Sequence, residues 1–332
     1  MVGSLLLWLL VRAEPDLLAK SKLLVDYDKR VIVFKGIPAP DYCWINADEI
    51  LFSPDEGSLD SNVHWHAFDV QTGKSREIPG LHRTDYSSAR WGPPVVDPSG
   101  KLLMWRTNID RTPGWEITDM DGKSLGRWAG HGHLLTWSHF YQEENRACWS
   151  ADGKSVLESV LKTDQGSVGV QVWRRTRSDL THETDFPFMS PAETTLLTVP
   201  IVDLGDDGIE WIAPLDPWQR KLAAAKIMSW QPGAPEHRHD VTLDFPDSEG
   251  IPQCEVSPDH REILWATGSG TRRELDLWVS KIDGSQLQKL GFVKIDERTP
   301  LLETGLHFPH WVQGRHAISF LYDHSLYEVP VP

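Results

Sequence analysis

The stretch Trp149–Leu157 reads Trp-Ser-Ala-Asp-Gly-Lys-Ser-Val-Leu, a polar turn followed by an apolar segment. Asp152 and Gly153 are residue types that tolerate the positive φ angles of a tight hairpin turn. Val156 and Leu157 open a run in which apolar residues alternate, as they do in a half-buried strand. The stretch therefore predicts the turn and second strand of a β-hairpin.

Variants of this phrase occur six times along the chain. Equivalent turn residues are separated by 51, 53, 55, 52 and 54 positions, a period that chance patterning does not hold over five steps. The copies are Trp44–Phe52, Val96–Met104, Trp149–Leu157, Leu204–Ile212, Val256–Leu264 and Trp311–Phe320, with turn residues Asp48, Ser99, Asp152, Asp207, Asp259 and Gln313. A period of this length indicates a repeat architecture.

Each repeat also contains a second hairpin, which gives four short strands per unit and predicts an all-β, single β-propeller of four-stranded antiparallel blades. The last repeat has only three strands before the chain ends. Because an open sheet edge pairs with other chains, the ring is expected to close on itself. The β-forming stretch Arg30–Lys35 is predicted to supply the missing strand. We therefore expect six blades over residues 25–332, preceded by an N-terminal segment at residues 1–24.

The repeat resembles that of the TolB-like and WD-repeat-like β-propellers, whose motif is roughly Trp-Ser-Pro-Asp-Gly-Lys-x-Ile-x-Phe. The copies at Trp149 and Val256 match it closely, and the resemblance extends over nearly the whole chain from about Arg30. It implies a propeller fold. It implies no single activity, because propellers of this kind serve as scaffolds, as binding proteins and as domains of hydrolases and lyases.

The composition restricts the classes of partner. The chain has 33 Lys and Arg against 48 Asp and Glu, a formal net charge of −15, which argues against a nucleic-acid partner. The acidic excess favours solubility and cationic partners or metal ions. No segment is long enough to span a bilayer as a helix, and a monomer is expected. The 16 tryptophans are predicted to pack between blades, with a stacking platform for sugar or peptide as the alternative.

The three cysteines are predicted to be structural thiols on the first strands of blades one, three and five. An odd number cannot pair completely, and Cys43, Cys148 and Cys254 each precede a repeat turn. Counting back from the turn residues places Cys148 on the opposite strand face from the other two. A metal site built from all three is therefore not expected.

The N-terminal run Val2–Val11 is apolar but too short to cross a bilayer as a helix. It is similar to the hydrophobic part of a secretory signal, with Val11–Ala13 as a cleavage point. The alternative is an amphipathic helix that continues through Asp16–Leu24 and packs on the propeller. The first reading predicts a periplasmic or secreted protein, and the second a cytoplasmic one.

Candidate binding residues lie in the long loops that share one face of the propeller. Long irregular loops on a rigid scaffold are the usual place for function. The longest is His131–Arg146, and a further insertion, Asp216–Lys226, is predicted to form a short helix on the same face. The alternative reading is that these side chains are solvated loop residues. The candidates for ligand binding are His82, Asp85, Tyr86, Arg90, Arg111, His131, His133, Gln142 and Glu143.

Three histidines are candidate metal ligands because they open inner strands and can approach the axis: His139, His307 and His310. This arrangement resembles the metal-dependent oligogalacturonate lyases, which look like this repeat family and hold a divalent metal with His and Gln at the mouth of a seven-bladed ring. The alternative is that these imidazoles bond to neighbouring backbone. The sequence requires no cofactor, and binding of a divalent metal in the central channel remains an alternative.

Two functions follow from these observations. The leading one is a non-catalytic binding or scaffold propeller that engages a protein or glycan on its loop face. The alternative is a metal-dependent lyase or hydrolase that acts on an acidic oligosaccharide, with a loop arginine such as Arg90 holding a carboxylate. The chain has no Gly-x-Ser-x-Gly nucleophile elbow, so the serine-hydrolase domain that some propellers carry is not expected.

Overall fold

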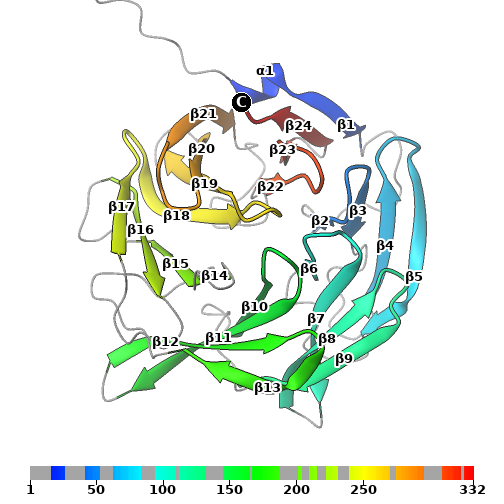
Figure 1. The fold of residues 1–332 in the computed structure, drawn as a ribbon. Helices are drawn as coiled ribbons and strands as arrows, with labels where there is room; N and C mark the ends of the chain where they lie inside the picture. Colours follow the sequence, from blue (N-terminus) through cyan, green and yellow to red (C-terminus); the bar gives the residue numbers. More distant parts are fainter. Residues whose placement is uncertain are drawn as a thin grey trace, which may run out of the picture.

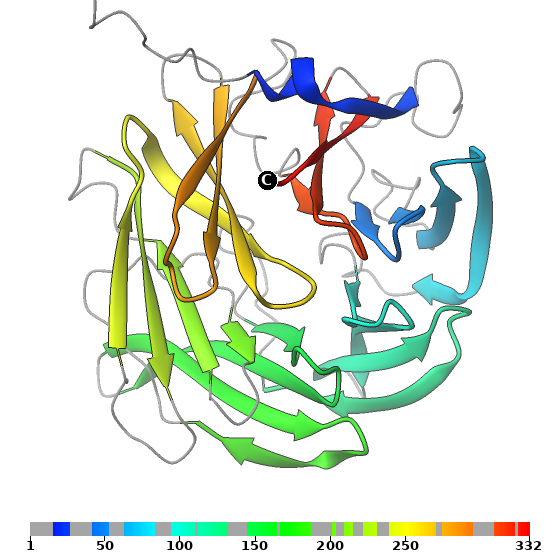
Figure 2. The ribbon, with the colours of Figure 1, turned by 45° about the horizontal axis from the view of Figure 1, so that its top comes forward.

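The computed structural model describes one short helix and 24 strands. The strands form six four-stranded antiparallel sheets, with no other sheet in the part of the chain that the structure describes. Figure 1 shows the sheets arranged around a common centre, and Figure 2 shows the same arrangement tilted by 45°. The expected all-β propeller of antiparallel four-stranded sheets is confirmed. The described residues are 16–26, 42–52, 63–83, 94–109, 112–131, 145–164, 167–186, 201–203, 209–214, 222–230, 239–269, 274–294, 309–322 and 325–332.

Within each sheet the strands follow chain order from the centre outward, except that the sixth sheet takes its outer strand from the N-terminal part of the chain. Sheet 1 contains β2 (Tyr42–Trp44), β3 (Glu49–Phe52), β4 (Val63–Asp69) and β5 (Lys74–Arg83). Sheet 2 contains β6 (Val95–Val96), β7 (Leu102–Ile109), β8 (Thr112–Asp119) and β9 (Ser124–Ala129). Sheet 3 contains β10 (Asn145–Trp149), β11 (Ser155–Asp164), β12 (Ser167–Thr176) and β13 (Asp179–Asp185).

The remaining sheets follow the same plan. Sheet 4 contains β14 (Ile201–Asp203), β15 (Ile209–Pro214), β16 (Ala224–Trp230) and β17 (His239–Asp244). Sheet 5 contains β18 (Glu249–Val256), β19 (Glu262–Ser269), β20 (Glu274–Lys281) and β21 (Gln288–Lys294). Sheet 6 contains β22 (His310–Trp311), β23 (Ala317–Tyr322), β24 (Ser325–Pro330) and β1 (Lys22–Asp26). The first strand of each sheet lies nearest the centre in Figure 1.

The strand that completes sheet 6 is β1, so the prediction that Arg30–Lys35 would occupy this place is wrong. Lys22 pairs with Glu328 and Asp26 with Ser325, which uses the outer edge of β24. Arg30–Lys35 itself lies outside the described residues. Strand propensity favoured the more apolar stretch, but pairing is decided by which residues can bury a side chain against the next sheet. Val25 does so and is almost fully buried.

The helix that precedes β1 is shorter than the amphipathic helix that one interpretation of the sequence predicted. Helix α1 (Leu17–Lys20) has four residues, begins with the Asp16 side chain accepting a hydrogen bond from the Leu18 backbone at 3.0 Å, and gives way to β1 at Lys22. The expected amphipathic helix through Leu24 is therefore wrong, and the expected boundary at residues 24 and 25 falls inside β1. No helix among the described residues has the length and apolar character of a membrane span.

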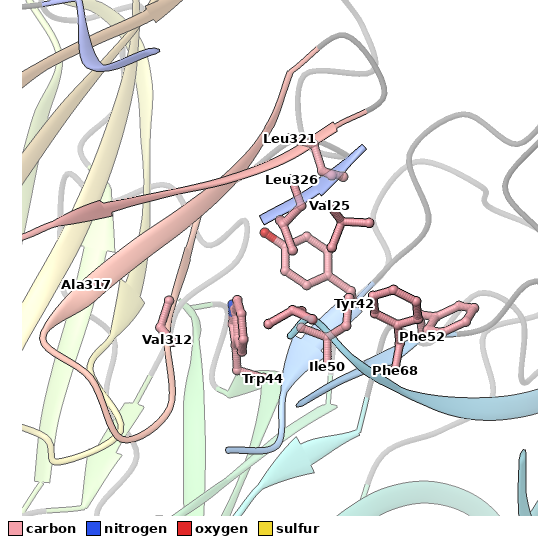
Figure 3. Close-up of a cluster of buried hydrophobic side chains, with 11 residues drawn as sticks. Val25, Tyr42, Trp44, Ile50, Phe52, Phe68, Val312, Ala317, Leu321 and Leu326 are labelled. Carbon is pink, nitrogen blue, oxygen red and sulfur yellow. The ribbon is translucent and has the colours of Figure 1, made fainter. Parts of the chain in front are cut away.

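Hydrophobic clusters lie between neighbouring sheets rather than inside any one of them. One cluster, drawn in Figure 3, joins Val25, Val312 and Leu326 of sheet 6 to side chains of sheet 1 such as Trp44 and Phe52. Five further clusters join the other consecutive sheets. Each sheet therefore buries both faces against its neighbours, as radial packing of blades requires.

The tryptophan that opens a repeat bonds to the sheet before it. The indole Nε1 of Trp44 donates to Ser319 Oγ of sheet 6 at 2.7 Å. Trp149 donates to the Val95 carbonyl of sheet 2 at 3.0 Å, and Trp311 to the Glu255 carbonyl of sheet 5 at 3.1 Å. An acceptor for the N–H of a buried indole offsets the hydrogen bond to water that burial removes. The predicted role of tryptophan in packing between blades is confirmed for these three.

The repeat turns are held by their own side chains and by glycine. In sheet 2, Asp97 Oδ1 accepts from the backbone of Lys101 and of Leu102, each at 2.7 Å. Gly100 follows with φ +70°, and Gly153 has φ +67° at the equivalent position in sheet 3. This conformation explains the glycine of the motif, because residues with a Cβ adopt it only at a cost.

Gly100→Ala is expected to destabilise the protein by about 2–4 kcal/mol, through both the left-handed backbone and a close contact. A Cβ at Gly100 would lie 2.6 Å from the Ile45 carbonyl oxygen of sheet 1, a backbone atom that cannot swing aside. Urea unfolding measures the loss. Gly250→Ala is the matched control, because Gly250 has φ +84° but open space where its Cβ would be, so it should cost only about 1 kcal/mol. Equal losses would contradict the steric part of this account.

The strand register corrects the prediction about the cysteines. Trp44 pairs with Ile50, whereas Trp149 pairs with Val156, so the turn of sheet 1 is one residue shorter than that of sheet 3. Counting back from the turn residue therefore misplaced the strand faces. Cys43 and Cys148 each pack toward the following sheet, and Cys254 packs toward the preceding one. None of these three described cysteines is in a disulfide.

Candidate functional site

The structure describes three of the twelve predicted site residues at least in part. His82 lies in β5, where it pairs with His64, and only its backbone is described. His131 directly follows sheet 2 and lies between sheets 2 and 3, whereas His310 lies in β22 of sheet 6. The other predicted residues lie outside the described part of the chain: Asp85, Tyr86, Arg90, Arg111, His133, His139, Gln142, Glu143 and His307.

The predicted insertion Asp216–Lys226 is only partly described. Its last three residues, Ala224–Lys226, begin strand β16 and pair with residues of β17. The prediction that the helix would extend to Lys226 is therefore wrong. Good helix formers occupy these positions, but sheet pairing and burial of Ala224 and Ala225 decide the local structure.

A buried ion pair lies at the joint between sheets 2 and 3. Glu158 of β11 is fully buried, and the Arg175 side chain of β12 is only 6% exposed. Arg175 Nη1 donates to Glu158 Oε2 at 3.1 Å, and the Trp128 indole of sheet 2 donates to the same oxygen at 3.2 Å. The guanidinium also lies over the Trp128 ring, 5.7 Å from its centre. Burial removes the hydration of a charged group, and these hydrogen bonds and the contact with the Trp128 ring offset that loss.

His131, the last described residue before sheet 3, completes this group. Its backbone N–H donates to Glu158 Oε1 at 2.8 Å. Its imidazole stacks on the Trp173 ring with 3.8 Å between centres and 9° between planes. Glu183 of β13 reaches the same place, 2.8 Å from His131 Nε2, and also accepts from Arg175. We call His131, Glu158, Arg175 and Glu183 the charged cluster.

The charged cluster has an inner pair and an outer pair. The inner pair is Glu158 and Arg175, and the outer pair is His131 and Glu183, whose side chains are 30% and 31% exposed. His131 Nε2 lies 2.8 Å from a carboxylate oxygen and 3.2 Å from Arg175 Nη2. Since a carboxylate only accepts and a guanidinium only donates, a protonated Nε2 donates to Glu183 and an unprotonated one accepts from Arg175.

The balance of charge gives the outer pair a preference for positive groups. Two carboxylates face one guanidinium, so the charged cluster carries one net negative charge while His131 is neutral. A cationic side chain of a ligand would balance it. The inner pair and the stacking on Trp173 hold the outer groups in place, which is the preorganisation that a binding site requires.

A second polar group lies on the innermost strands of sheets 5, 6 and 1. His310 Nδ1 lies 2.7 Å from Glu255 Oε2 of β18, and both side chains are partly exposed. Tyr42 of β2 meets the His310 ring edge to face, with 4.8 Å between ring centres, and its hydroxyl lies 3.0 Å from Ser319 Oγ. We call His310, Glu255 and Tyr42 the axial group.

No set of three or more His, Cys, Asp or Glu side chains within the described ranges is arranged to hold a metal ion. In the axial group, His310 and Glu255 could supply an imidazole and a carboxylate. A carboxylate that orients a histidine is a common second-sphere arrangement at metal sites. Two of the three predicted ligands, His139 and His307, lie outside the described residues, so the predicted set is not tested by this geometry.

The sequence analysis identified His131 and His310 but none of the other residues of the charged cluster and the axial group. Glu158 lies in the apolar run Ser155–Leu161, and Arg175 follows the apolar run Val168–Trp173. A charged residue inside a strand that is otherwise apolar is a signal of a buried ion pair, since an unpaired one would be too costly. Nothing in the local sequence indicated that Glu255 would meet His310, because the two strands are 55 residues apart.

No protein-family model matches the chain, and no curated protein matches it. Among solved structures, the chain is similar to TolB from Acinetobacter baumannii, with 15% identity over 74% of this chain and 52% of that chain and a TM-score of 0.43. It is similar to a putative TolB from Agrobacterium tumefaciens, with 10% identity over 76% of this chain and 80% of that chain and a TM-score of 0.42.

The chain is also similar to an oligogalacturonate lyase in complex with manganese. The identity is 9% over 89% of this chain and 90% of that chain, with a TM-score of 0.49. TolB-like propellers, the family that the repeat resembles, are therefore among the structures similar to this chain. The chain spans about half the length of the Acinetobacter baumannii TolB structure.

Proposed function

We propose that this protein is a non-catalytic binding propeller, which engages a protein or glycan on its loop face beside sheets 2 and 3. The observation that carries the proposal is the charged cluster. Its outer pair, His131 and Glu183, is half-buried and stands on a fully buried ion pair. Partly exposed polar groups that are held in place by a buried ion pair, beside a loop predicted from the sequence, suit recognition of a polar ligand. The negative charge of the cluster favours a ligand with a cationic group near this point.

The proposal includes the arrangement of the whole chain. We infer a single domain formed by one closed ring of six blades, with β1 as the closing strand. The pairing of β1 with β24 and the packing of sheet 6 on sheet 1 support this arrangement. From the sequence of the N-terminal run we further propose a periplasmic or secreted protein. We propose a monomer in solution.

Replacing the outer pair tests the binding proposal. The variant His131→Ala/Glu183→Gln should lower affinity for ligands captured by the unaltered protein by roughly 10- to 100-fold, as expected for loss of hydrogen bonds from charged groups. Binding is measured against a glycan array and a panel of purified basic proteins, with the melting temperature recorded to verify folding.

The control for this experiment is Lys154→Ala, which lies in the repeat turn of sheet 3 and is highly exposed. It should leave capture unchanged. If the double variant stays folded and captures every ligand as well as the unaltered protein does, the binding face has been assigned wrongly.

The axial group supports a second candidate, a metal-dependent lyase or hydrolase acting on an acidic oligosaccharide. The specific observation is the 2.7 Å contact between His310 and Glu255 on innermost strands. Metal analysis of the purified protein, before and after chelation, distinguishes the candidates. About one tightly held divalent ion per chain, lost in His310→Ala, would favour the enzyme. A metal-free protein that still binds its ligand would remove it.

A further inference from the structure

The repeat turn of sheet 6 carries a polar side chain where three of its counterparts do not. The second residue after the innermost strand is Pro98 in sheet 2, Ala151 in sheet 3 and Pro258 in sheet 5, but Gln313 in sheet 6. Gln313 is only 8% exposed, although glutamine is usually a surface residue. A buried amide needs hydrogen-bond partners in the protein, so the partners of Gln313 indicate what this turn does.

Gln313 bonds to a sheet that is not the neighbour of its own. Its Nε2 donates to the Pro98 carbonyl of sheet 2 at 2.8 Å and lies 3.5 Å from the Asp97 carbonyl. Sheet 1 lies between sheets 6 and 2, because hydrophobic clusters join it to each of them. The Gln313 side chain therefore reaches past sheet 1 and ties sheet 6 to sheet 2.

The turn of sheet 1 leaves room for this contact. Trp44 pairs with Ile50 across the turn of sheet 1. Trp311 pairs with Ile318 across the turn of sheet 6, which is one residue longer. A shorter turn extends less far from its sheet, and this lets the turns of the two sheets beside it meet.

Arg315, two residues further on, ties the same turn to sheet 1. Its Nη2 donates to the Ala47 carbonyl, and its Nη1 donates to Glu328 Oε2 of β24 at 2.8 Å. The guanidinium also lies over the Trp44 ring, 5.6 Å from its centre. Glu328 is the counter-ion of Arg315 and is only 12% exposed, so the charge is held within sheet 6 while the guanidinium reaches sheet 1. These contacts are made without any residue of β1.

We propose that Gln313 and Arg315 form an inner clasp, a second closure of the ring that holds sheet 6 to sheets 1 and 2 even when β1 is detached. β1 covers the outer edge of β24, where Lys22 pairs with Glu328, whereas the inner clasp acts at the innermost turn. The two closures use different groups at different places, so loss of one leaves the other intact. The proposal rests on the closed ring inferred above.

Hydrogen exchange of the Trp44 indole N–H, followed by NMR in the full chain, reports the joint of sheets 6 and 1, because this group donates to Ser319. Val25→Asp releases β1, since a carboxylate at this buried position would lose its hydration. Loss of protection at the amides of β1 verifies the release. The indole should then exchange within about tenfold of its rate in the unaltered protein. Adding Gln313→Ala and Arg315→Met should accelerate it by roughly a further 10- to 100-fold, as expected for loss of a neutral and a charged hydrogen bond.

The control combines Val25→Asp with Arg261→Ala, which removes an arginine in the repeat turn of sheet 5 whose side chain is 81% exposed. It should leave the indole at the exchange rate of Val25→Asp alone. The inner clasp is refuted if Val25→Asp alone exposes the indole as fully as the three substitutions do. It is equally refuted if the two further substitutions accelerate the exchange no more than the control does.

A second measurement answers the same question should Val25→Asp not fold. In the unaltered protein, exchange of the β1 amides and of the Trp44 indole is compared in increasing urea below the unfolding transition. The indole should open in a separate, costlier event and exchange at least about tenfold more slowly, whereas in Gln313→Ala/Arg315→Met the two should open together. A single shared opening in the unaltered protein overturns the proposal. An indole without protection in the unaltered protein would overturn the closed ring and the inner clasp with it, and neither result bears on ligand binding at the charged cluster.

Discussion

Arg175→Met is expected to lower the free energy of unfolding by about 3–5 kcal/mol. The reason is the charge left behind rather than the contact removed. Glu158 has no solvent exposure, and the Arg175 guanidinium lies 3.1 Å from its carboxylate. Without the guanidinium, the carboxylate would remain buried and unbalanced or would take up a proton on folding. Urea unfolding at pH 7 measures the loss.

The matched control is Lys154→Ala, which removes an ion pair of the same sheet. Lys154 and Asp152 are 3.0 Å apart, but their side chains are 79% and 55% exposed, so the loss should be below about 1 kcal/mol. A second comparison adds Glu158→Leu to Arg175→Met. Because both charges are then absent, the double variant should recover much of the lost stability. A single variant as stable as the unaltered protein would contradict the buried-pair account.

Removing residues 1–26 is expected to cost at least about 3–6 kcal/mol. The truncation deletes β1 and α1, and with them the buried side chains of Val25 and Leu17, each worth about 1.5–3 kcal/mol. It also leaves the edge of β24 without its partner strand. Since small proteins are stable by only about 5–15 kcal/mol, the loss is a large part of the total. Chemical denaturation measures it.

The control for the truncation is a chain that lacks only residues 1–15. This shorter deletion keeps α1 and β1, and it should retain nearly all the stability that the longer deletion loses. Size-exclusion chromatography gives a second readout, because an exposed strand edge promotes association between chains. If the chain without residues 1–26 unfolds at the same urea concentration as the one without residues 1–15, β1 does not close the ring as proposed.

The repeat could be predicted from sequence because each copy carries its own cause. Asp97 and Gly100 make the sheet 2 turn with bonds inside the turn itself. Turn chemistry of this kind can be recognised from a few consecutive residues. The tryptophans were equally legible, since a large side chain at a fixed strand position has to pack against a neighbouring blade. Strand faces were less secure, because the shorter turn of sheet 1 shifted the count for Cys43.

The candidate site was less predictable for a physical reason. His131 and His310 were identified from residue type and position, but their partners could not be. Glu183 lies 52 residues from His131, and Glu255 lies 55 residues from His310. These separations are close to one repeat, so each partner belongs to a neighbouring sheet. Contacts between blades depend on how two sheets pack, which no local pattern records.

By itself, the sequence determined that this chain forms four-stranded antiparallel sheets in radial repeat, because turn chemistry and alternation act over a few residues. Only the tertiary structure decided which strand completes sheet 6 and which carboxylate meets each histidine. The sequences of Lys22–Asp26 and Arg30–Lys35 are both compatible with a strand. The former pairs with β24, and this pairing buries Val25 between sheets 6 and 1. Such choices depend on the free energy of packing between distant segments, which exists only once the sheets are assembled.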